Sequence, residues 1–337
     1  MLAITGSNGK TTTKELVHAV LAADRRTLAT VGNLNNHIGV PLTLLRIKTE
    51  HAFAIIEMGA NKPGDIDELM RIAEPTHGLI TNIGKAHLEG FGSLEGVVRT
   101  KTELYRWLKA HGGQVFVNGD DPLLTEKASA CAQRFTYGAA NGSNCQGGLL
   151  ESDSCLSFWF RSTKGEHVEV RTRLIGSYNL PNALAAVAVG QMFGVPDALI
   201  ATALEGYSPG NNRSQWKETG SNQLVLDAYN ANPTSVEAAL RHFAHLHAAK
   251  PKLAILGDML ELGQEANAEH QRIAALCIEL GLESIFVGPA HAAAGAPNAF
   301  DSLESLMDSW KGGAPKGRVI LLKGSRGMQL ERLEPML

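Results

Sequence analysis

The chain has 337 residues, 44% hydrophobic and 19% charged, so it is long enough for two domains that each bury a core. The net charge is −3 without a long run of one sign, which argues against a nucleic acid partner, because that binding needs a basic surface. No apolar run approaches the ~20 residues of a membrane span. The cysteines form no CxxC pair, which fits reduced thiols and a cytoplasmic location: Cys131, Cys145, Cys155 and Cys277.

Short apolar runs alternate with helical stretches in the first part of the chain. Strands are predicted at LAIT (2–5), AFAIIEMGA (52–60) and HGLITNIG (77–84), and helices at 11–23 and 183–192. This alternation is typical of a parallel sheet with helices on both faces. Residues 145–175 differ, because CLSFWFRS and HVEVRTRL alternate polar and apolar residues, which predicts a small antiparallel appendage of hairpin strands.

The stretch EGYSPGNNRSQ (205–215) is rich in Gly, Pro, Asn and Ser, which indicates a domain boundary. Beyond it the strand–helix rhythm restarts, with a helix from Thr234 to about His247 and strands at 223–231, 252–258, 284–288 and 317–324. We therefore predict an α/β protein of two domains. Residues 1–208 would form a central domain with a phosphate loop and a parallel sheet, and residues 209–337 a smaller Rossmann-like α/β domain.

A glycine-rich loop directly follows the first predicted strand and opens a helix. Backbone N–H groups and a helix N-terminus hold phosphate oxygens, Lys10 adds a positive charge, and the Thr11 hydroxyl can bind Mg²⁺. The spacing is shorter than the usual GxxxxGK[ST], and a glycine-rich turn without a ligand is the alternative interpretation. The pattern predicts a nucleotide phosphate site made of Gly6, Ser7, Asn8, Gly9, Lys10, Thr11 and Thr12.

Two further residues stand at predicted strand ends, where ligands bind in open α/β sheets. Glu57 ends AFAIIE and could supply the carboxylate that Mg²⁺ prefers, although an ordinary strand-end carboxylate is the alternative. His87 follows the strand that contains Leu79 and Ile80, and a lone histidine is more often structural.

Other polar residues have plain interpretations. Lys101 lies in the helical stretch RTKTEL and by itself looks like a solvated lysine. NGDDP, with Asp120 and Asp121, indicates a turn. Three histidines on a Leu/Ala-rich helix are predicted to lie on its surface rather than to bind a metal: His242, His245 and His247.

Taken in order, the motifs resemble one family. They are TGSNGKTT, NLNNHIGVP, IEMGAN, AHLEGFGS, Lys101, GSYNLPNALAA, DAYNANPTS, GDMLELG and KGSR. The series resembles the Mur ligases from residue 1 to about residue 330. NLNNHIGVP, AHLEGFGS and DAYNANP together resemble the branch that adds D-alanyl-D-alanine (D-Ala-D-Ala). GKTT alone is shared with folylpolyglutamate synthases.

The resemblance implies ATP as substrate and two Mg²⁺ ions. Lys10 would be the loop lysine, and Thr11 and Glu57 would share the first Mg²⁺. His87 would bind the second Mg²⁺. Lys101 falls at the family's carbamylated lysine, where addition of CO₂ would turn a repelled ammonium into an anionic oxygen ligand.

The resemblance also assigns the remaining candidates. Asn179 and Asn182 would reach the adenine, and Arg213 would lie near the phosphates, although the usual GR pair reads NNR here. Asp227 and Tyr229 would close over the ribose and phosphates. Residues expected to approach the acyl-phosphate site or the substrates are Asn33, Asn36, Asn230, Asn232, Lys323, Ser325 and Arg326. Lys10, Lys101, His87, Asn36 and Arg213 would be the catalytic set.

By resemblance, the chain is an ATP-dependent amide ligase of peptidoglycan precursor synthesis. Its substrates would be UDP-N-acetylmuramoyl-tripeptide (UDP-MurNAc-tripeptide) and D-Ala-D-Ala, joined through an acyl phosphate. Family members carry about one more domain before the phosphate loop, and that domain binds the UDP part of the substrate. We therefore expect a fragment or a split protein whose UDP-binding domain is separate, or a chain that no longer binds UDP. Two alternatives are a related ligase with another substrate and a nucleotide-binding partner without turnover.

Overall fold

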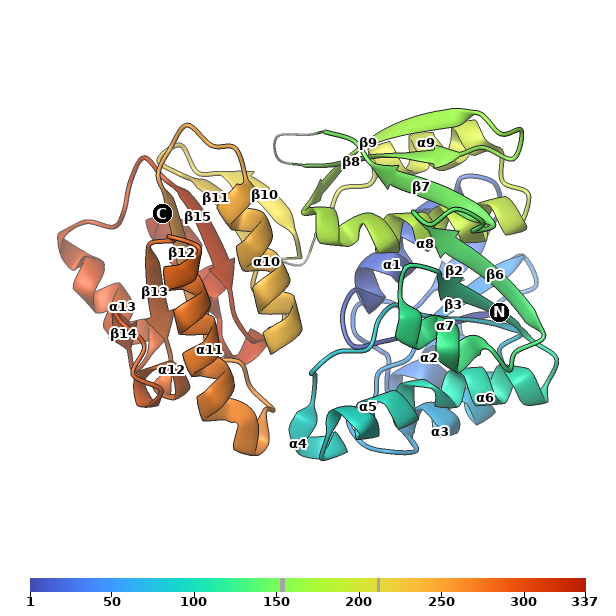
Figure 1. Cartoon of the computed structure of the whole chain (residues 1–337), viewed down its shortest axis with the longest axis horizontal. Coiled ribbons are helices and arrows are strands. Elements are labelled where there is room, and N and C mark those ends of the chain that lie inside the picture. The colour runs from blue at the N-terminus through green and yellow to red at the C-terminus, as the bar shows by residue number, and fades with distance from the viewer. Residues whose placement is uncertain (152–154, 211–212) are drawn as a thin grey trace.

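Two sheets, each covered by helices, lie side by side along the long axis of the molecule (Figure 1). The computed structural model describes residues 1–151, 155–210 and 213–337. Parts of the predicted appendage (152–154) and of the predicted boundary (211–212) lie outside the described residues. The α/β class is confirmed, whereas the boundary between residues 208 and 209 stays a prediction.

The first sheet has nine strands in the order β2-β3-β1-β4-β5-β6-β7-β8-β9. Pairing is parallel from β2 to β7 and antiparallel from β7 to β9, so the predicted appendage continues the parallel sheet. The strands are β1 (Leu2–Thr5), β2 (Thr27–Ala29), β3 (Phe53–Glu57), β4 (His77–Ile80), β5 (Gln114–Asn118), β6 (Gln133–Gly138), β7 (Cys145–Leu149), β8 (Cys155–Arg161) and β9 (His167–Ile175).

Helices cover both faces of this sheet because its central strands are apolar on both sides. On one face, Leu2 and Ile4 pack with Leu16 of α1; on the other, Ala3 and Ile56 belong to the cluster of α3, α6 and α7. The helices are α1 (Lys10–Ala22), α2 (Gly39–Leu44), α3 (Asp65–Ala73), α4 (Leu88–Phe91), α5 (Leu94–Lys101), α6 (Glu103–Ala110), α7 (Pro122–Ala128), η1 (Ser177–Asn179), α8 (Leu180–Met192) and α9 (Asp197–Gly206).

The second sheet has six strands in the order β10-β11-β15-β12-β13-β14. In this sheet β10 and β11 pair antiparallel, and the other neighbouring strands pair parallel. The strands are β10 (Gln215–Glu218), β11 (Gln223–Asp227), β12 (Lys252–Gly257), β13 (Ser284–Val287), β14 (Ala299–Phe300) and β15 (Val319–Lys323). The helices are α10 (Pro233–His245), η2 (Gly263–Glu265), α11 (Ala266–Glu279), α12 (Pro289–Ala293), α13 (Leu303–Ser309), η3 (Trp310–Gly312), η4 (Arg326–Met328) and η5 (Leu330–Met336).

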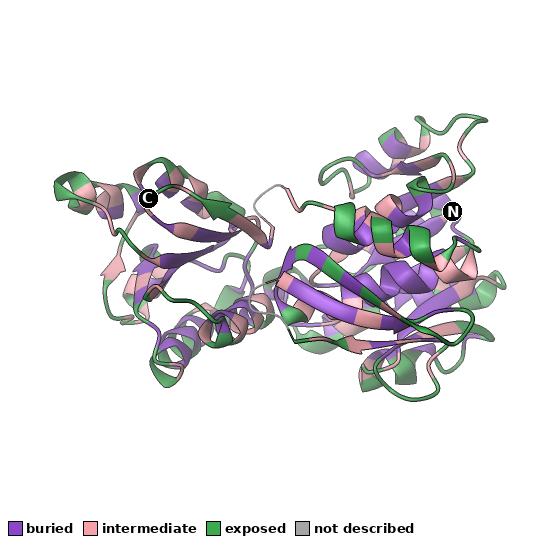
Figure 2. Ribbon diagram, turned by 90° about the horizontal axis from the view of Figure 1, so that it is seen from above, coloured by how far each residue is buried: buried purple, intermediate pink, exposed green. Residues whose placement is uncertain are grey.

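Buried residues concentrate on the strands and on the helix faces turned toward them (Figure 2). The predicted elements are confirmed with small shifts at their ends. The helix expected from residue 183 begins at Leu180, because Pro181 fits the first turn of a helix, where no N–H is needed. Within the part of the chain that the structure describes, no helix has the length and apolar character that crossing a bilayer requires.

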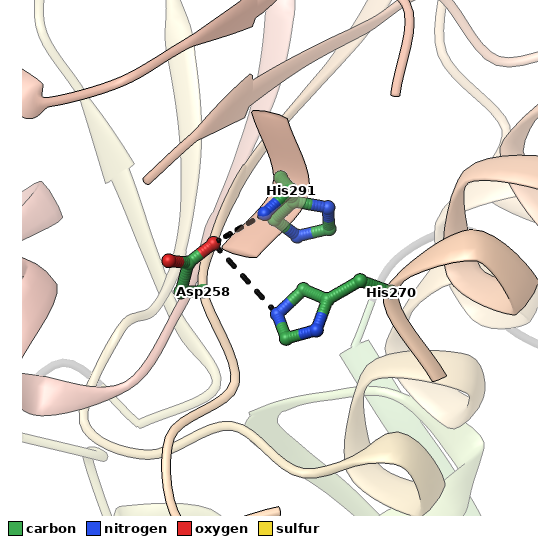
Figure 3. A group of neighbouring side chains, drawn as sticks. All are labelled: Asp258, His270 and His291. Carbon is green, nitrogen blue, oxygen red and sulfur yellow. Dashed lines mark hydrogen bonds and ion pairs between the residues drawn. The ribbon is translucent and has the colours of Figure 1, made fainter. Parts of the chain in front are cut away.

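The second domain contains a buried polar cluster of Asp258, His270 and His291 (Figure 3). Asp258 accepts the N–H groups of Ala290 (2.9 Å) and His291 (3.0 Å). His270 accepts the Met259 N–H on Nε2 (3.0 Å), while its Nδ1 lies 2.6 Å from the Ala266 carbonyl oxygen. These bonds already use the Asp258 and His270 atoms that could bind a metal, whereas His291 Nδ1 is buried without a hydrogen-bond partner among the described residues. We interpret the cluster as a structural network that holds the turn after β12.

Burial lowers the pKa of His291 to about 3, with the neighbouring His270 a smaller cause. Between about pH 6.5 and pH 3, His291 is protonated in the unfolded chain but neutral in the folded protein. The unfolded state therefore binds more protons, and the free energy of unfolding falls as pH falls through this window. We expect His291→Gln to remove this part of the acid sensitivity, which is at most about 1.4 kcal/mol per pH unit.

The measurement is the thermal unfolding midpoint of both proteins at pH 7.5 and pH 5.5. The midpoint should fall less in His291→Gln than in wild type. Some decline should remain, because burial also lowers the pKa of His77 to about 4. Equal declines in the two proteins would contradict the assignment to His291.

Candidate active site

The strand register brings three strand ends together beside the glycine-rich loop. In the parallel pairing, Ile4 lies opposite Glu57 and Thr5 lies opposite Ile80, so the segments after β1, β3 and β4 leave the same edge of the sheet. Sequence-distant residues therefore meet there: the loop before α1, the Glu57 carboxylate and Asn82.

The loop from Gly6 to Gly9 is held by the segment after β4. The N–H groups of Ser7 and Asn8 donate to the carbonyl oxygen of Asn82 (2.9 Å) and to its side-chain oxygen (3.0 Å). Gly9 has φ 79°, a left-handed conformation that glycine adopts without strain, immediately before α1. The helix N-terminus and its N–H groups are thereby presented for an anion.

Lys10 lies over this loop. Its Nζ donates to the carbonyl oxygens of Gly6 (2.7 Å) and Ser7 (3.1 Å). Burial of the ammonium group lowers the pKa of Lys10 to about 8; Glu57 opposes this effect, and Arg213 adds to it. Because Glu57 only partly offsets the cost of burying this ammonium group, Lys10 is suited to bind an anion.

Glu57 is 1% exposed, and its two carboxylate oxygens differ. Oε1 accepts bonds from Asn35 Nδ2 (2.8 Å) and Thr11 Oγ1 (3.2 Å). Oε2 is buried without a hydrogen-bond partner, and the nearest cation is Lys14 Nζ at 4.0 Å. A buried carboxylate oxygen without a donor, next to a threonine hydroxyl, has the chemistry of a Mg²⁺ ligand pair.

Lys101, the last residue of α5, is buried (1% exposed), contrary to the solvated lysine expected from its local sequence. Among the described residues, its Nζ forms no hydrogen bond or ion pair, and it lies over the face of the Phe91 ring, 5.6 Å from the centroid. Burial, followed by the charge of Lys10, holds the pKa of Lys101 well below its usual value. A lowered pKa favours the neutral amine, which is the form that reacts with CO₂.

The second domain contributes the opposite wall. Asp227 lies opposite Lys323 in the β11–β15 pairing, and their side chains form an ion pair of 2.7 Å. Arg213 stacks on Tyr229, with its guanidinium carbon 3.5 Å from the ring centroid. Asn232, at the start of α10, donates to Asn8 Oδ1 of the phosphate loop (2.6 Å) and so joins the two domains.

These walls enclose a cleft of about 350 Å³, within the size range of small-molecule sites. It contains most of the predicted residues: Ser7, Asn8, Gly9, Lys10, Thr11, Thr12, Asn33, Glu57, His87, Asn179, Asn182, Arg213, Asp227, Tyr229, Asn230 and Lys323. Asn182 also supports the loop, since its Oδ1 accepts from Thr13 Oγ1 (3.0 Å) and its Nδ2 donates to Asn179 (2.9 Å).

Other predicted residues lie outside the cleft lining. Asn36 is exposed and accepts the N–H groups of Ile38 (3.1 Å) and Gly39 (2.9 Å) at the start of α2. Buried Ser325 accepts the Leu260 N–H (2.9 Å), and exposed Arg326 approaches the ring of Tyr229 at 5.3 Å. Gly6, Lys101 and Asn232 lie behind the lining. The roles assigned to these residues stay predictions.

Three residues that contribute to the site were not predicted from the sequence. Asn35, rather than Asn36, contacts Glu57, but three asparagines in NLNN gave no basis for choosing between them. Asn82 follows the end of β4, so the strand-end argument used for Glu57 would have found it. Lys14, buried behind Glu57, is four residues after Lys10 and shares its helix face.

The histidines of α10 are only partly as expected. His245 is exposed, and His247 is exposed beyond the end of α10. His242 is half-buried, with its ring 6.0 Å from that of Tyr178 in an edge-on arrangement. NGDDP forms the predicted turn, in which Asp121 caps α7.

Comparison with known proteins decides the family. The Mur ligase middle domain matches residues 4–190, and the Mur ligase glutamate ligase domain matches residues 212–326. This chain belongs to the Mur ligase family. The resemblance read from the motifs is confirmed, and family membership covers both domains that form the cleft.

Named relatives of this Mur ligase share one activity. It is 36% identical to the UDP-N-acetylmuramoyl-tripeptide–D-alanyl-D-alanine ligase of Bacillus subtilis and 34% identical to that of Escherichia coli. Each alignment covers 99% of this chain, and respectively 74% and 75% of the relative. The chain thus spans about three quarters of the length of these relatives.

Solved structures of Mur ligases have the same fold as this chain. A crystal structure of MurF from Acinetobacter baumannii superposes with a TM-score of 0.88 at 33% identity, covering 99% of this chain and 75% of that one. MurF ligase from Thermotoga maritima, in complex with ADP, gives 0.87 at 26% identity, covering 99% and 78%.

A substitution in the phosphate loop tests its role in this Mur ligase. A Cβ on Gly9 would lie 2.6 Å from Asn182 Oδ1, and φ +79° is unfavourable for alanine. We expect Gly9→Ala to weaken binding of ADP with Mg²⁺ at least ~10-fold, measured by calorimetry, because the loop must move. The control is Gly112→Ala, which has φ +66° but no atom within 4 Å of the added carbon. Equal affinities in the two variants would refute the loop assignment.

Proposed function

We propose that this chain joins D-Ala-D-Ala to UDP-MurNAc-tripeptide at the expense of ATP, in the synthesis of peptidoglycan precursors. The observation that carries the proposal is the cleft itself. It places the phosphate loop of one domain against the Asp227–Lys323 and Arg213–Tyr229 pairs of the other. The relatives named for this reaction align over both walls of that cleft. Because ATP is consumed, we place the reaction in the cytoplasm.

ATP would lie with its phosphates on the loop. The N–H groups at the start of α1 and the Lys10 ammonium would hold the β- and γ-phosphates. Arg213 and Tyr229 lie across the cleft, where a guanidinium can pair with phosphate and a ring can face the nucleoside. Buried Asn179 and Asn182 line the same cleft and offer amide groups to a base.

The residues present fit two Mg²⁺ ions. Thr11 Oγ1 and the unpartnered Oε2 of Glu57 would hold the first, while His87 and a carbamylated Lys101 would hold the second. When bound, the ions would neutralise negative charge on the phosphate oxygens, which phosphoryl transfer requires. The carbamate is supported by the burial of Lys101, by the absence of an ion pair to it among the described residues, and by its pKa, which burial lowers despite the charges of Asp65 and Glu103.

The reaction would proceed in two steps. The terminal carboxylate of the tripeptide attacks the γ-phosphorus, the bond to the ADP oxygen breaks, and an acyl phosphate and ADP result. The amine of D-Ala-D-Ala then attacks the acyl carbon, loses a proton, and expels phosphate to leave the amide. Contacts between the domains, such as Asn8–Asn232, would keep the cleft closed to water, which would otherwise hydrolyse the acyl phosphate.

The direct test is phosphate release from ATP with UDP-MurNAc-tripeptide, with and without D-Ala-D-Ala. Release that requires both substrates would support the ligase. ATP binding without release would instead favour a need for a separate UDP-binding domain. Release that occurs only with a different acid or amine would indicate a related ligase with another substrate.

Lys101→Ala tests the carbamate. We expect it to abolish phosphate release, and a small carboxylate such as formate to restore part of it, because the carboxylate could replace the missing anionic ligand. The matched control is Lys109→Ala on the neighbouring helix α6, where the lysine is exposed. Full activity in Lys101→Ala would remove the residue from the mechanism.

A further inference from the structure

Glu261, in the turn after β12, has no assigned role, yet it contacts His87 of the cleft. His87 Nδ1 lies 2.6 Å from Oε2 of Glu261, which belongs to the second domain; the distance is that of an ion pair, and the ring N–H is not aligned with the carboxylate as in a hydrogen bond. The Glu89 N–H donates to the Glu261 carbonyl oxygen (3.2 Å), and Lys85 forms an ion pair with Glu269 (2.6 Å). The segment after β4 is thus tied to the second domain at three points, two on Glu261 in the turn after β12 and one on Glu269 of α11.

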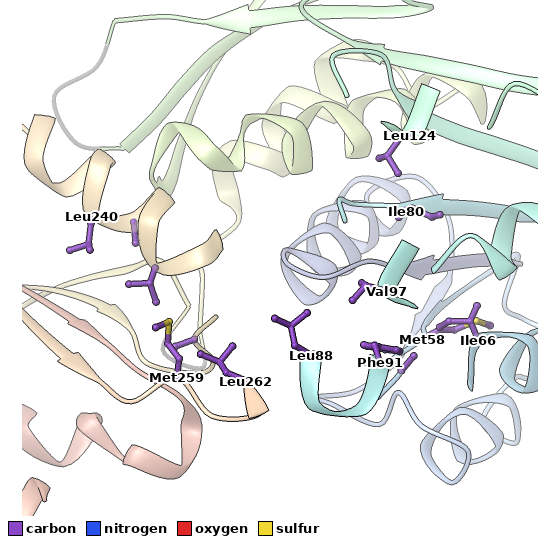
Figure 4. Close-up of a cluster of buried hydrophobic side chains, with 14 of the residues drawn as sticks. Met58, Ile66, Ile80, Leu88, Phe91, Val97, Leu124, Leu240, Met259 and Leu262 are labelled. Atoms are coloured by element: carbon purple, nitrogen blue, oxygen red, sulfur yellow. The ribbon is translucent and has the colours of Figure 1, made fainter. Parts of the chain in front are cut away.

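Apolar contacts accompany these polar ones. Leu88 lies beside His87 and faces Met259 and Leu262, which flank Glu261 in the second domain (Figure 4). All three are buried and belong to one cluster that spans both domains. The position of Glu261 opposite His87 is therefore fixed by packing on both sides of the contact.

The turn that carries Glu261 is also held from behind. Met259 donates to buried His270, and Leu260 donates to Ser325 Oγ (2.9 Å). Ser325 in turn donates its N–H to the Asp258 carbonyl oxygen (3.2 Å). The buried cluster of Figure 3 thus anchors the turn at its base. Glu261, farther along the turn, contacts His87 of the first domain.

Stability does not explain this arrangement. The Glu261 side chain is 52% exposed, and an ion pair so exposed contributes little to stability. Both partners also adopt left-handed backbone conformations, with φ 66° for Glu261 and φ 52° for His87. Such strain at non-glycine residues costs stability and concentrates at functional sites.

We propose that Glu261 is a positioning residue that the second domain supplies to His87. At this distance a small rotation of either side chain lets the carboxylate accept the Nδ1–H, which fixes the ring and its tautomer and leaves Nε2 for the second Mg²⁺. Carboxylates that orient metal-binding histidines in this way recur in metal sites. Separation of the domains would break the contact, so His87 would be oriented only in the closed enzyme. The inference rests on the proposed function, because it assigns His87 to Mg²⁺.

The kinetic test compares Glu261→Ala, Glu261→Gln and the control Glu265→Ala. Glu265 lies in the same segment and is exposed, so its loss changes the net charge equally without touching His87. We expect Glu261→Ala to raise the Mg²⁺ concentration for half-maximal phosphate release, or to lower kcat, by ~10–100-fold, with the ATP KM nearly unchanged. Glu261→Gln, which keeps an acceptor, should be intermediate, and Glu265→Ala should match wild type.

A second readout does not depend on activity. Long-range ¹H–¹⁵N spectra of the metal-free full chain at pH 8 report which ring nitrogen of His87 carries the proton, with His87→Asn used to assign the signal. We expect the proton on Nδ1 in wild type and a shift toward Nε2 in Glu261→Ala. Equal thermal midpoints would show that the variant is folded.

The outcomes separate the two hypotheses. If wild type releases no phosphate with either substrate set, the proposed ligase function fails, while the spectra still decide whether Glu261 holds His87. If wild type is active, the positioning role is overturned by a ring state that Glu261→Ala leaves unchanged. It is also overturned by Mg²⁺ dependence and kcat that match those of Glu265→Ala.

Discussion

The parallel register of β1, β3 and β4 is the constraint on which the site depends. It directs the phosphate loop, Glu57 and Asn82 to one edge of the sheet, because the carboxyl ends of parallel strands lie at the same edge. Neither the loop nor the carboxylate would form a nucleotide site alone. Their proximity follows from apolar strands that must be covered on both faces, which the packing of α1 and α3 provides.

The cleft keeps charged groups incompletely paired, which is costly in a folded protein. Lys10 and Lys101 have lowered pKa values, and Glu57 Oε2 has no donor. Such groups are retained where a ligand supplies the missing partner. Nucleotide, metal and CO₂ would each compensate one of them, so the proposed chemistry accounts for features that hydrophobic packing does not. The second domain adds Lys323 and Asp227, paired with each other and facing the same space.

Contacts between the two domains bring charged groups of both into one cleft. Asn8–Asn232, Lys85–Glu269 and His87–Glu261 all join loops of the first domain to the second, and Leu88 adds an apolar contact between them. Each polar contact is weak in water. Together they hold the two walls of the cleft against each other, and they couple the environment of His87 to the position of the second domain.

The sequence by itself determined the α/β class, the phosphate loop, the strand-end position of Glu57 and the family resemblance, because these depend on local periodicity and contiguous motifs. Only the tertiary structure decided that Lys101 is buried, that Asn35 rather than Asn36 reaches Glu57, and that Glu261 meets His87. Burial and long-range contacts are set by strand register and domain packing, which bring together residues as distant in sequence as His87 and Glu261. Local patterns carry no information about such distances.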